Sequence, residues 1–162
     1  MVYNKTKKGE IMKLYLVRHG KAQPKEKDPN KSLSTQGRSL TRKTGLFLKE
    51  KQFIVDAVWH SPKKRAVETA EIIMQNLSCE KVDERDDLNP DDPVKKFPKE
   101  ITSLNKELMI VGHLPFLQKL ASLLLTGKEN LDLVEFVNSG VVCLEYEENW
   151  KILWGVTPKL ML

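Results

Sequence analysis

The sequence predicts an α/β fold, a three-layer sandwich in which helices flank a mostly parallel central sheet with an antiparallel edge. Three observations predict it. Short apolar segments alternate along the chain with longer segments whose apolar residues have helical spacing. Two of the short segments, Leu14–Val17 and Leu108–Val111, lack polar alternation, as strands buried on both faces do. The last two apolar segments follow one another without a helix, which is typical of an antiparallel hairpin.

In the first half of the chain, strands are followed by loops and helices. The predicted elements are the strand Leu14–Val17, the helix Ser34–Lys51, the strand Val55–Trp59, a helix opened by Ser61-Pro62, and a short strand Glu80–Val82. Serine suits a helix N-cap because its hydroxyl accepts from a free N–H group, and proline suits the first turn, where its missing N–H costs nothing. The apolar faces of the two helices are marked by Leu40, Thr44 and Phe47, and by Ala66, Ala70, Ile73 and Leu77.

The second half begins with an acidic segment and returns to alternating strands and helices. Its predicted elements are a short helix capped by Asp92-Pro93, the strand Leu108–Val111, a helix over Pro115–Leu125, and the strands Val141–Tyr146 and Lys151–Val156, joined near Glu148-Asn149. This order completes the α/β pattern.

Length and composition indicate one soluble domain. A chain of 162 residues fits a single core, which we expect over residues 12–162. The polar, lysine-rich segment Met1–Ile11 is expected to be a flexible N-terminal extension rather than a secretory signal. No apolar stretch approaches the ~18 residues that a membrane span requires. Cys79 and Cys143 lie far apart without metal-ligand spacing, which indicates a reduced, cytoplasmic setting and no bound metal.

The net charge of +5 favours anionic partners in general. The lysines are scattered among acidic residues, however, and no basic cluster is interleaved with aromatic residues as in a nucleic-acid surface. We therefore expect a monomer with no nucleic-acid or membrane partner.

Three predicted strand ends carry related chemistry. Arg18 and His19 follow the first strand, Arg65 lies one turn into the helix after the second, and His113 follows the strand Leu108–Val111. In open α/β sheets, ligands bind at the carboxyl ends of the strands. Two guanidinium groups can hold phosphate oxygens with paired N–H donors, a neutral imidazole can attack phosphorus, and a protonated imidazole can stabilise the oxygens. These residues therefore predict a phosphoryl-transfer site.

The motifs that carry these residues resemble those of the histidine phosphatase superfamily, which also includes cofactor-dependent phosphoglycerate mutases. The similar segments are Leu14 to Gly20, Leu33-Ser34-Thr35-Gln36-Gly37, Ser61 to Ala70, and Ile110-Val111-Gly112-His113, in the family's order. The resemblance extends from about Met12 to Pro158. It implies that His19 is the phosphorylated nucleophile and that Arg18, Arg65 and His113 complete the phosphate pocket.

Within that superfamily, the short chain resembles phosphohistidine phosphatases of the SixA type. Mutases and most phosphomonoesterases carry a general-acid glutamate two residues after a leucine, where this chain has Leu88-Asn89-Pro90. Proline at that position is also a feature of SixA-type proteins. Asp87, Asp91 and Asp92 are alternative acids, although solvated loop carboxylates are the simpler interpretation.

These observations predict a metal-independent, cofactor-free phosphohistidine phosphatase. It would act on a phosphorylated histidine in a partner protein, through a covalent enzyme intermediate, and release inorganic phosphate. Two alternatives stay open: a phosphatase for small phosphate monoesters, and a catalytically silent phosphate-binding module.

Four further residues invite other interpretations. His60 could line the pocket, but a local hydrogen bond at the strand end is the simpler reading. Lys21 could attract anions or simply be solvated. Cys79 and Arg85 have the Cys-x5-Arg spacing of thiol phosphatases. Because the residues between them include carboxylates and no glycine, we exclude a thiolate site there.

Overall fold

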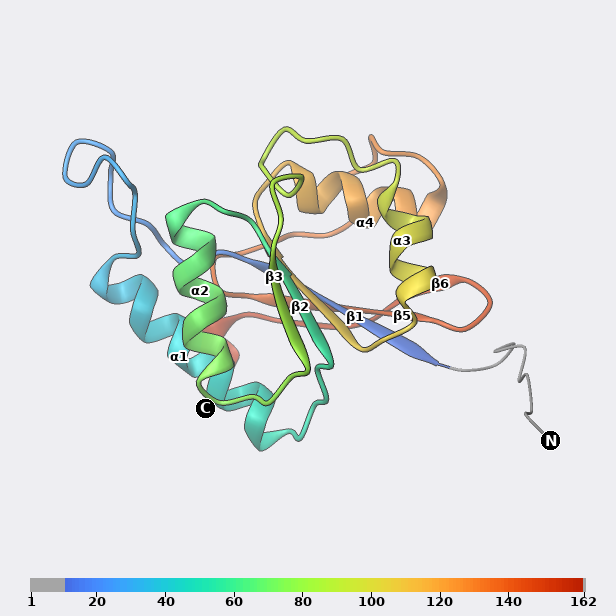
Figure 1. The fold of residues 1–162 in the computed structure, drawn as a ribbon, viewed down its shortest axis with the longest axis horizontal. Coiled ribbons are helices and arrows are strands. Elements are labelled where there is room, and N and C mark those ends of the chain that lie inside the picture. Colours follow the sequence, from blue (N-terminus) through green and yellow to red (C-terminus); the bar gives the residue numbers. More distant parts are fainter. Residues whose placement is uncertain (1–10, 162) are drawn as a thin grey trace.

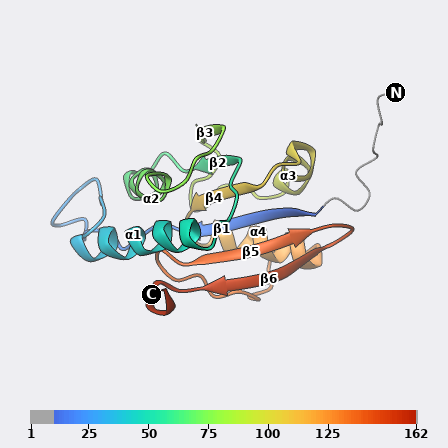
Figure 2. The ribbon, with the colours of Figure 1, turned by 90° about the horizontal axis from the view of Figure 1, so that it is seen from below.

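The computed structural model describes residues 11–161, and its centre is a six-stranded sheet. The strand order is β3-β2-β4-β1-β5-β6, visible from top to bottom in Figure 2. The four strands from β3 to β1 are parallel, whereas β5 runs antiparallel to β1 and β6 antiparallel to β5. The strands are β1 Met12–Arg18, β2 Ala57–His60, β3 Lys81–Glu84, β4 Leu108–Gly112, β5 Val141–Tyr146 and β6 Trp150–Val156.

Helices cover both faces of this sheet, which confirms the predicted three-layer α/β sandwich. Figure 1 shows α1 and α2 on one side of the strands and α3 and α4 on the other. The helices are α1 Thr35–Glu50, α2 Lys64–Met74, α3 Phe97–Leu104 and α4 Phe116–Thr126, with a short 3-10 helix at Pro158–Leu160. No helix within residues 11–161 is long and apolar enough to cross a bilayer.

Alternate residues of the central strands divide the core into two. Leu14 and Leu16 pack with α3 and α4, whereas Tyr15 and Val17 pack with α1 and α2. All four are at most 1% exposed, because successive side chains of a strand point to opposite faces and both faces are covered. The uniform apolarity of this segment is thus the consequence of its central place.

Several predicted boundaries are wrong. The helix α2 begins at Lys64, not at Ser61-Pro62, and it ends at Met74, before Leu77. The Ser61 hydroxyl accepts from the Lys63 N–H at 3.2 Å, so serine closes a turn ahead of the helix rather than capping it. Likewise α3 begins at Phe97, beyond Asp92-Pro93.

Other predicted features agree with the structure or lie outside it. Ser34 caps α1, its hydroxyl accepting from the Gly37 N–H at 2.9 Å. The strand predicted over Val55–Trp59 is observed at Ala57–His60, and β5 lies where it was predicted. The predicted extension Met1–Ile11 lies outside the described residues except for Ile11, which is exposed.

Candidate active site

The sheet brings two of the predicted residues, His19 and His113, to one place. β1 and β4 are adjacent and parallel, with Arg18 opposite Gly112, so the residues that follow both strands meet at the carboxyl edge. The His19 N–H donates to the Gly112 carbonyl oxygen at 3.0 Å. As a result, the ring centroids of His19 and His113 are 5.0 Å apart, with planes inclined by 54°.

The hydrogen bond of the His19 ring determines which nitrogen is free. Its Nδ1 lies 2.7 Å from the Gly20 carbonyl oxygen, which can only accept a hydrogen bond. We therefore assign the hydrogen to Nδ1, which leaves the lone pair of Nε2 unprotonated. Asn138 donates its amide N–H to the His19 carbonyl oxygen at 2.9 Å and so fixes the backbone of the same residue.

Both imidazoles are held neutral. Burial lowers the pKa of His19 to about 4, and the nearby charges of Arg65 and Arg18 act in the same direction. Burial, followed by the proximity of His19 and Arg65, lowers the pKa of His113 to about 3. At neutral pH the site therefore contains two uncharged imidazoles beside two guanidinium groups.

His113 is only 1% exposed, and its ring has one hydrogen-bond partner in the described chain. Its Nε2 lies 2.7 Å from the hydroxyl of Ser61, while its Nδ1 is buried without a partner. Buried polar atoms are almost always paired, so an orphaned ring nitrogen marks a place where a polar ligand would be stabilised. Sequence reasoning missed Ser61 as a partner of His113, because it placed that serine at a helix N-cap.

The two arginines have few partners. Arg18 donates Nη1 to the Phe136 carbonyl oxygen at 2.9 Å, and its Nε is buried without a hydrogen bond. Within residues 11–161, the Arg65 guanidinium makes no ion pair and no hydrogen bond. Burial lowers the pKa of both arginines, since no carboxylate compensates for the loss of water. The charges of both guanidinium groups are therefore available to an anionic ligand.

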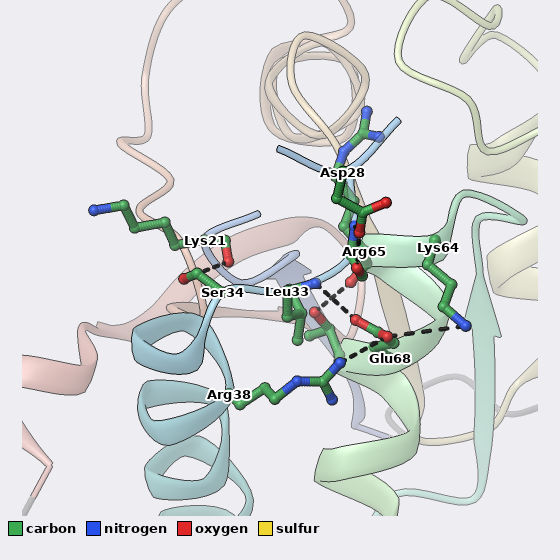
Figure 3. A network of polar contacts seen from close by, with 10 residues as sticks. Lys21, Asp28, Leu33, Ser34, Arg38, Lys64, Arg65 and Glu68 are labelled. Carbon is green, nitrogen blue, oxygen red and sulfur yellow. Dashed lines mark hydrogen bonds and ion pairs between the residues drawn. The ribbon is translucent and has the colours of Figure 1, made fainter. Parts of the chain in front are cut away.

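Side chains of α2 fasten the loop between β1 and α1 next to these groups. The Glu68 carboxylate accepts from the Leu33 N–H at 2.7 Å and from Arg38 at 2.8 Å, as Figure 3 shows. Thr69 accepts from the Gly20 N–H at 2.9 Å and donates to the Arg65 carbonyl oxygen at 2.7 Å. These roles of Glu68 and Thr69 were not predicted, because both residues stand in a helical pattern in the sequence.

Close packing explains the glycine at position 20. A Cβ there would lie 2.7 Å from the Thr41 hydroxyl oxygen and 3.0 Å from that of Ser139. Its φ angle is not positive, so the backbone conformation does not require glycine here. The residue is small because α1 and the loop before β5 approach the backbone at this point.

Sequence comparison finds one similar family. The model of the histidine phosphatase superfamily (branch 1) matches residues 14–90, which include β1, the loop after it, α1 and α2. The chain is thus similar to the histidine phosphatase superfamily over this segment. This similarity supports a phosphatase. No curated protein matches the chain in sequence.

Solved structures of several phosphatases share this fold. The protein histidine phosphatase SixA, solved with tungstate, is similar with a TM-score of 0.81 and 23% identity, over 91% of this chain and 98% of that one. A candidate phosphohistidine phosphatase SixA from Agrobacterium tumefaciens is similar with a TM-score of 0.75 and 19% identity, over 91% of this chain and 98% of that one. A phosphoserine phosphatase from Entamoeba histolytica, solved with 3-phosphoglyceric acid, is similar with a TM-score of 0.65 and 18% identity, over 93% of this chain and 100% of that one.

Of the three aspartates considered as alternative general acids, two bind other residues. Asp87 is paired with Arg85 at 2.6 Å and Lys96 at 2.7 Å, and these hydrogen bonds lower its pKa to about 2. Asp92 accepts from the Asn89 N–H at 2.7 Å. Asp91 is exposed on the same loop. The structure therefore gives Asp87 and Asp92 local structural contacts.

The remaining candidates have local contacts. His60 Nδ1 lies 3.0 Å from the Ser61 carbonyl oxygen, and its ring lines a separate cavity beside Met74 and Val82. Lys21 is exposed and donates to Gln36 at 3.1 Å. Burial raises the pKa of the Cys79 thiol, which supports the exclusion of a thiolate site. In the part of the chain that the structure describes, no group of three or more His, Cys, Asp or Glu residues could hold a metal ion.

Proposed function

We propose that this chain is a phosphohistidine phosphatase that removes the phosphoryl group from a histidine of a partner protein. The single observation that carries the proposal is the pairing of His19 and His113, whose ring centroids are 5.0 Å apart beside Arg18 and Arg65. The likeness to a protein histidine phosphatase in fold supports the same substrate class.

In the first step, His19 acts as the nucleophile. Its Nε2 carries the free lone pair, because Nδ1 donates to the Gly20 carbonyl oxygen. Nε2 attacks phosphorus in line, a new P–N bond forms, and the P–N bond of the substrate breaks. The departing histidine leaves as neutral imidazole, since solvent has protonated its other ring nitrogen. The low pKa of His19 keeps the attacking nitrogen unprotonated.

In the second step, water attacks the phosphorus of phosphorylated His19. The P–N bond to Nε2 breaks, the electron pair returns to that nitrogen, and inorganic phosphate is released. Arg18 and Arg65 stabilise the charge on the equatorial oxygens during both steps. His113 contributes as a hydrogen-bond donor once the phosphoryl dianion raises its pKa, because an opposite charge favours the protonated ring.

The surroundings of the pocket favour nitrogen over alkoxide as the leaving group. An alkoxide needs a proton donor, and Asp87 and Asp92 are bound to other partners. A protonated imidazole departs without a further acid. The proposal therefore expects faster hydrolysis of a phosphohistidine protein than of an alkyl phosphate monoester.

The decisive experiment traps the enzyme intermediate. The protein is mixed with a phosphohistidine protein labelled with 32P, quenched without acid, and mapped by mass spectrometry. We expect label on His19 in the wild type and none in His19→Ala. His60→Gln is the matched control, because it alters a histidine at a neighbouring strand end that lines a separate cavity, and its label should stay on His19.

Two results would contradict the proposal. Label on a residue other than His19 would overturn the assigned nucleophile. Equal kcat/KM for an alkyl phosphate monoester and the phosphohistidine protein would instead favour a general phosphomonoesterase.

A further inference from the structure

A basic cleft borders the candidate active site. It has a volume of about 790 Å³ and lies between the β1–α1 loop and the start of α2. Its basic residues are Lys25, Lys31, Lys63, Lys64 and Arg65. Among the described residues that line it there is no Asp or Glu and no aromatic side chain. So many cations without a carboxylate create a positive field that attracts an anionic ligand.

Two carboxylates that neighbour lining residues in sequence, Asp28 and Glu68, mainly make the hydrogen bonds that build this cleft. Asp28 accepts from the N–H groups of Asn30 and Ser32, at 2.9 and 3.0 Å, and from the Ser32 hydroxyl. Glu68 binds the Leu33 N–H and Arg38, and approaches Lys64 only to 3.9 Å. Figure 3 shows both carboxylates beside this part of the loop.

Three of the lysines stay uncompensated. Within residues 11–161, Lys25, Lys31 and Lys63 take part in no ion pair. Lys63 is also the N-cap of α2, which has no capping side chain and no acidic residue in its first turn. The positive end of the helix therefore adds to the same field.

Lys31 is placed by a costly backbone conformation. Its φ angle is +50°, in the left-handed region that side chains other than Asn, Asp and Gly rarely adopt. The Asp28 turn maintains this conformation, since the Lys31 N–H donates to the Asp28 carbonyl oxygen at 2.9 Å. Strain of this kind is typical of functional positions.

The cleft adjoins the phosphoryl pocket through Arg65. Arg65 belongs to both, and the charge of Lys31 lowers the pKa of both His19 and His113. One substrate can therefore place its phosphoryl group at His19 and further anionic groups in the cleft.

We propose that this cleft binds aspartate and glutamate side chains flanking the phosphorylated histidine, and so selects acidic protein substrates. This inference rests on the proposed function. A lysine side chain pairs with carboxylates as a mobile point charge. It can therefore bind acidic side chains at varying positions of a flexible substrate segment. A nucleic acid fits less well, because the cleft offers no aromatic side chain for base stacking.

The test compares two peptides with a central phosphohistidine, one flanked by aspartates and glutamates and the other by asparagines and glutamines. We expect the wild type to prefer the acidic peptide roughly tenfold in kcat/KM, as a few exposed charge pairs allow, and less at high salt. The double variant Lys25→Glu/Lys63→Glu, with one change on each wall, should lose this preference to within about twofold.

Lys43→Glu/Lys119→Glu is the matched control, since it makes the same charge change on exposed faces of α1 and α4. It should keep the preference. Lys25→Gln/Lys63→Gln serves as a milder pair if the glutamate variant fails to fold. A preference that survives in the cleft variants, or that is absent from the wild type, would overturn the proposal.

A binding measurement separates this inference from the proposed function. Fluorescence anisotropy with the unphosphorylated acidic peptide needs no turnover and should give weaker binding in the cleft variant than in the control. If neither phosphopeptide is hydrolysed, the proposed function fails, while anisotropy still decides on the cleft. If inorganic pyrophosphate, but not the acidic peptide, binds the wild type more tightly than the cleft variant, the cleft serves a small phosphate ligand and the inference is wrong.

Discussion

Two clusters with arginines lie near strand ends of the same sheet: Arg85 with its carboxylate partners, and Arg18 with Arg65. The guanidinium charge is paired with carboxylates in the first cluster and unpaired in the second. Beyond β3, Arg85 donates to Asp87 at 2.6 and 2.9 Å and to Glu100 at 2.8 Å, and it lies 4.3 Å from the centre of the Trp59 ring. At the end of β1 and beyond β2, Arg18 and Arg65 form no ion pair with any described residue.

The pKa shifts of the two clusters differ in sign for the same reason. Hydrogen bonds to Asp87 raise the pKa of Arg85, whereas burial lowers that of Arg18 and Arg65. A guanidinium saturated by carboxylates and stacked on an aromatic ring braces the fold. A guanidinium left without an anion retains its attraction for one. Three arginines at strand ends thus have two distinct uses, and their partners distinguish them.

The largest expected effect follows from replacing Arg65 by lysine. Arg65→Lys keeps the charge but loses the paired N–H donors, so we expect kcat to fall about 100-fold. Arg42→Lys on the exposed side of α1 is the control and should leave kcat near the wild-type value. The measurement is steady-state hydrolysis of a phosphohistidine protein. Near-normal turnover of Arg65→Lys would remove Arg65 from the pocket.

Arg85→Gln should have the opposite consequence. It leaves the partly buried carboxylates of Asp87 and Glu100 without their main partner, so the free energy of unfolding should fall by about 2 kcal/mol. Urea denaturation measures this loss, with exposed Lys95→Gln as control. Because Arg85 lies outside the phosphoryl pocket, kcat should change less than about threefold. A large drop in kcat with unchanged stability would reverse the roles assigned to the clusters.

The smallest effect concerns pH. His19 and His113 have folded-state pKa values of about 4 and about 3, below the ordinary value of 6.5. Between the folded-state values and 6.5, the unfolded chain binds more protons than the folded chain. The contribution of the two histidines to the free energy of unfolding therefore rises with pH, and it is lost as pH falls from about 7 to about 4.

We expect the two histidines to account for about 1–2 kcal/mol of that loss between about pH 7 and about pH 6, where they take up protons in the unfolded chain but not in the folded one. The double variant His19→Gln/His113→Gln should show a correspondingly flatter pH dependence in urea denaturation. Contributions of the carboxyl groups are common to both proteins and cancel in the difference. Parallel curves would show that the imidazoles are not desolvated as described.

The sequence predicts some parts of this molecule far better than others. Leu14–Val17 is predicted as a strand because its burial on both faces leaves a local signature of uninterrupted apolar residues. The start of α2 is not, because Ser61-Pro62 satisfies the rules for a helix N-terminus while the Ser61 hydroxyl pairs with His113, 52 residues away. A rule based on neighbouring residues has no access to such a partner.

The sequence by itself determined the α/β class and the candidate residues His19, Arg18, Arg65 and His113, because both depend on local order: apolar runs, and the residues that directly follow them. Only the tertiary structure decided which strands are neighbours. The pairing of β1 with β4 puts the rings of His19 and His113 5.0 Å apart, and the Asp28 turn places Lys31 at the cleft. These arrangements depend on hydrogen bonds and packing between distant segments, which compete across the whole chain and so leave no local pattern.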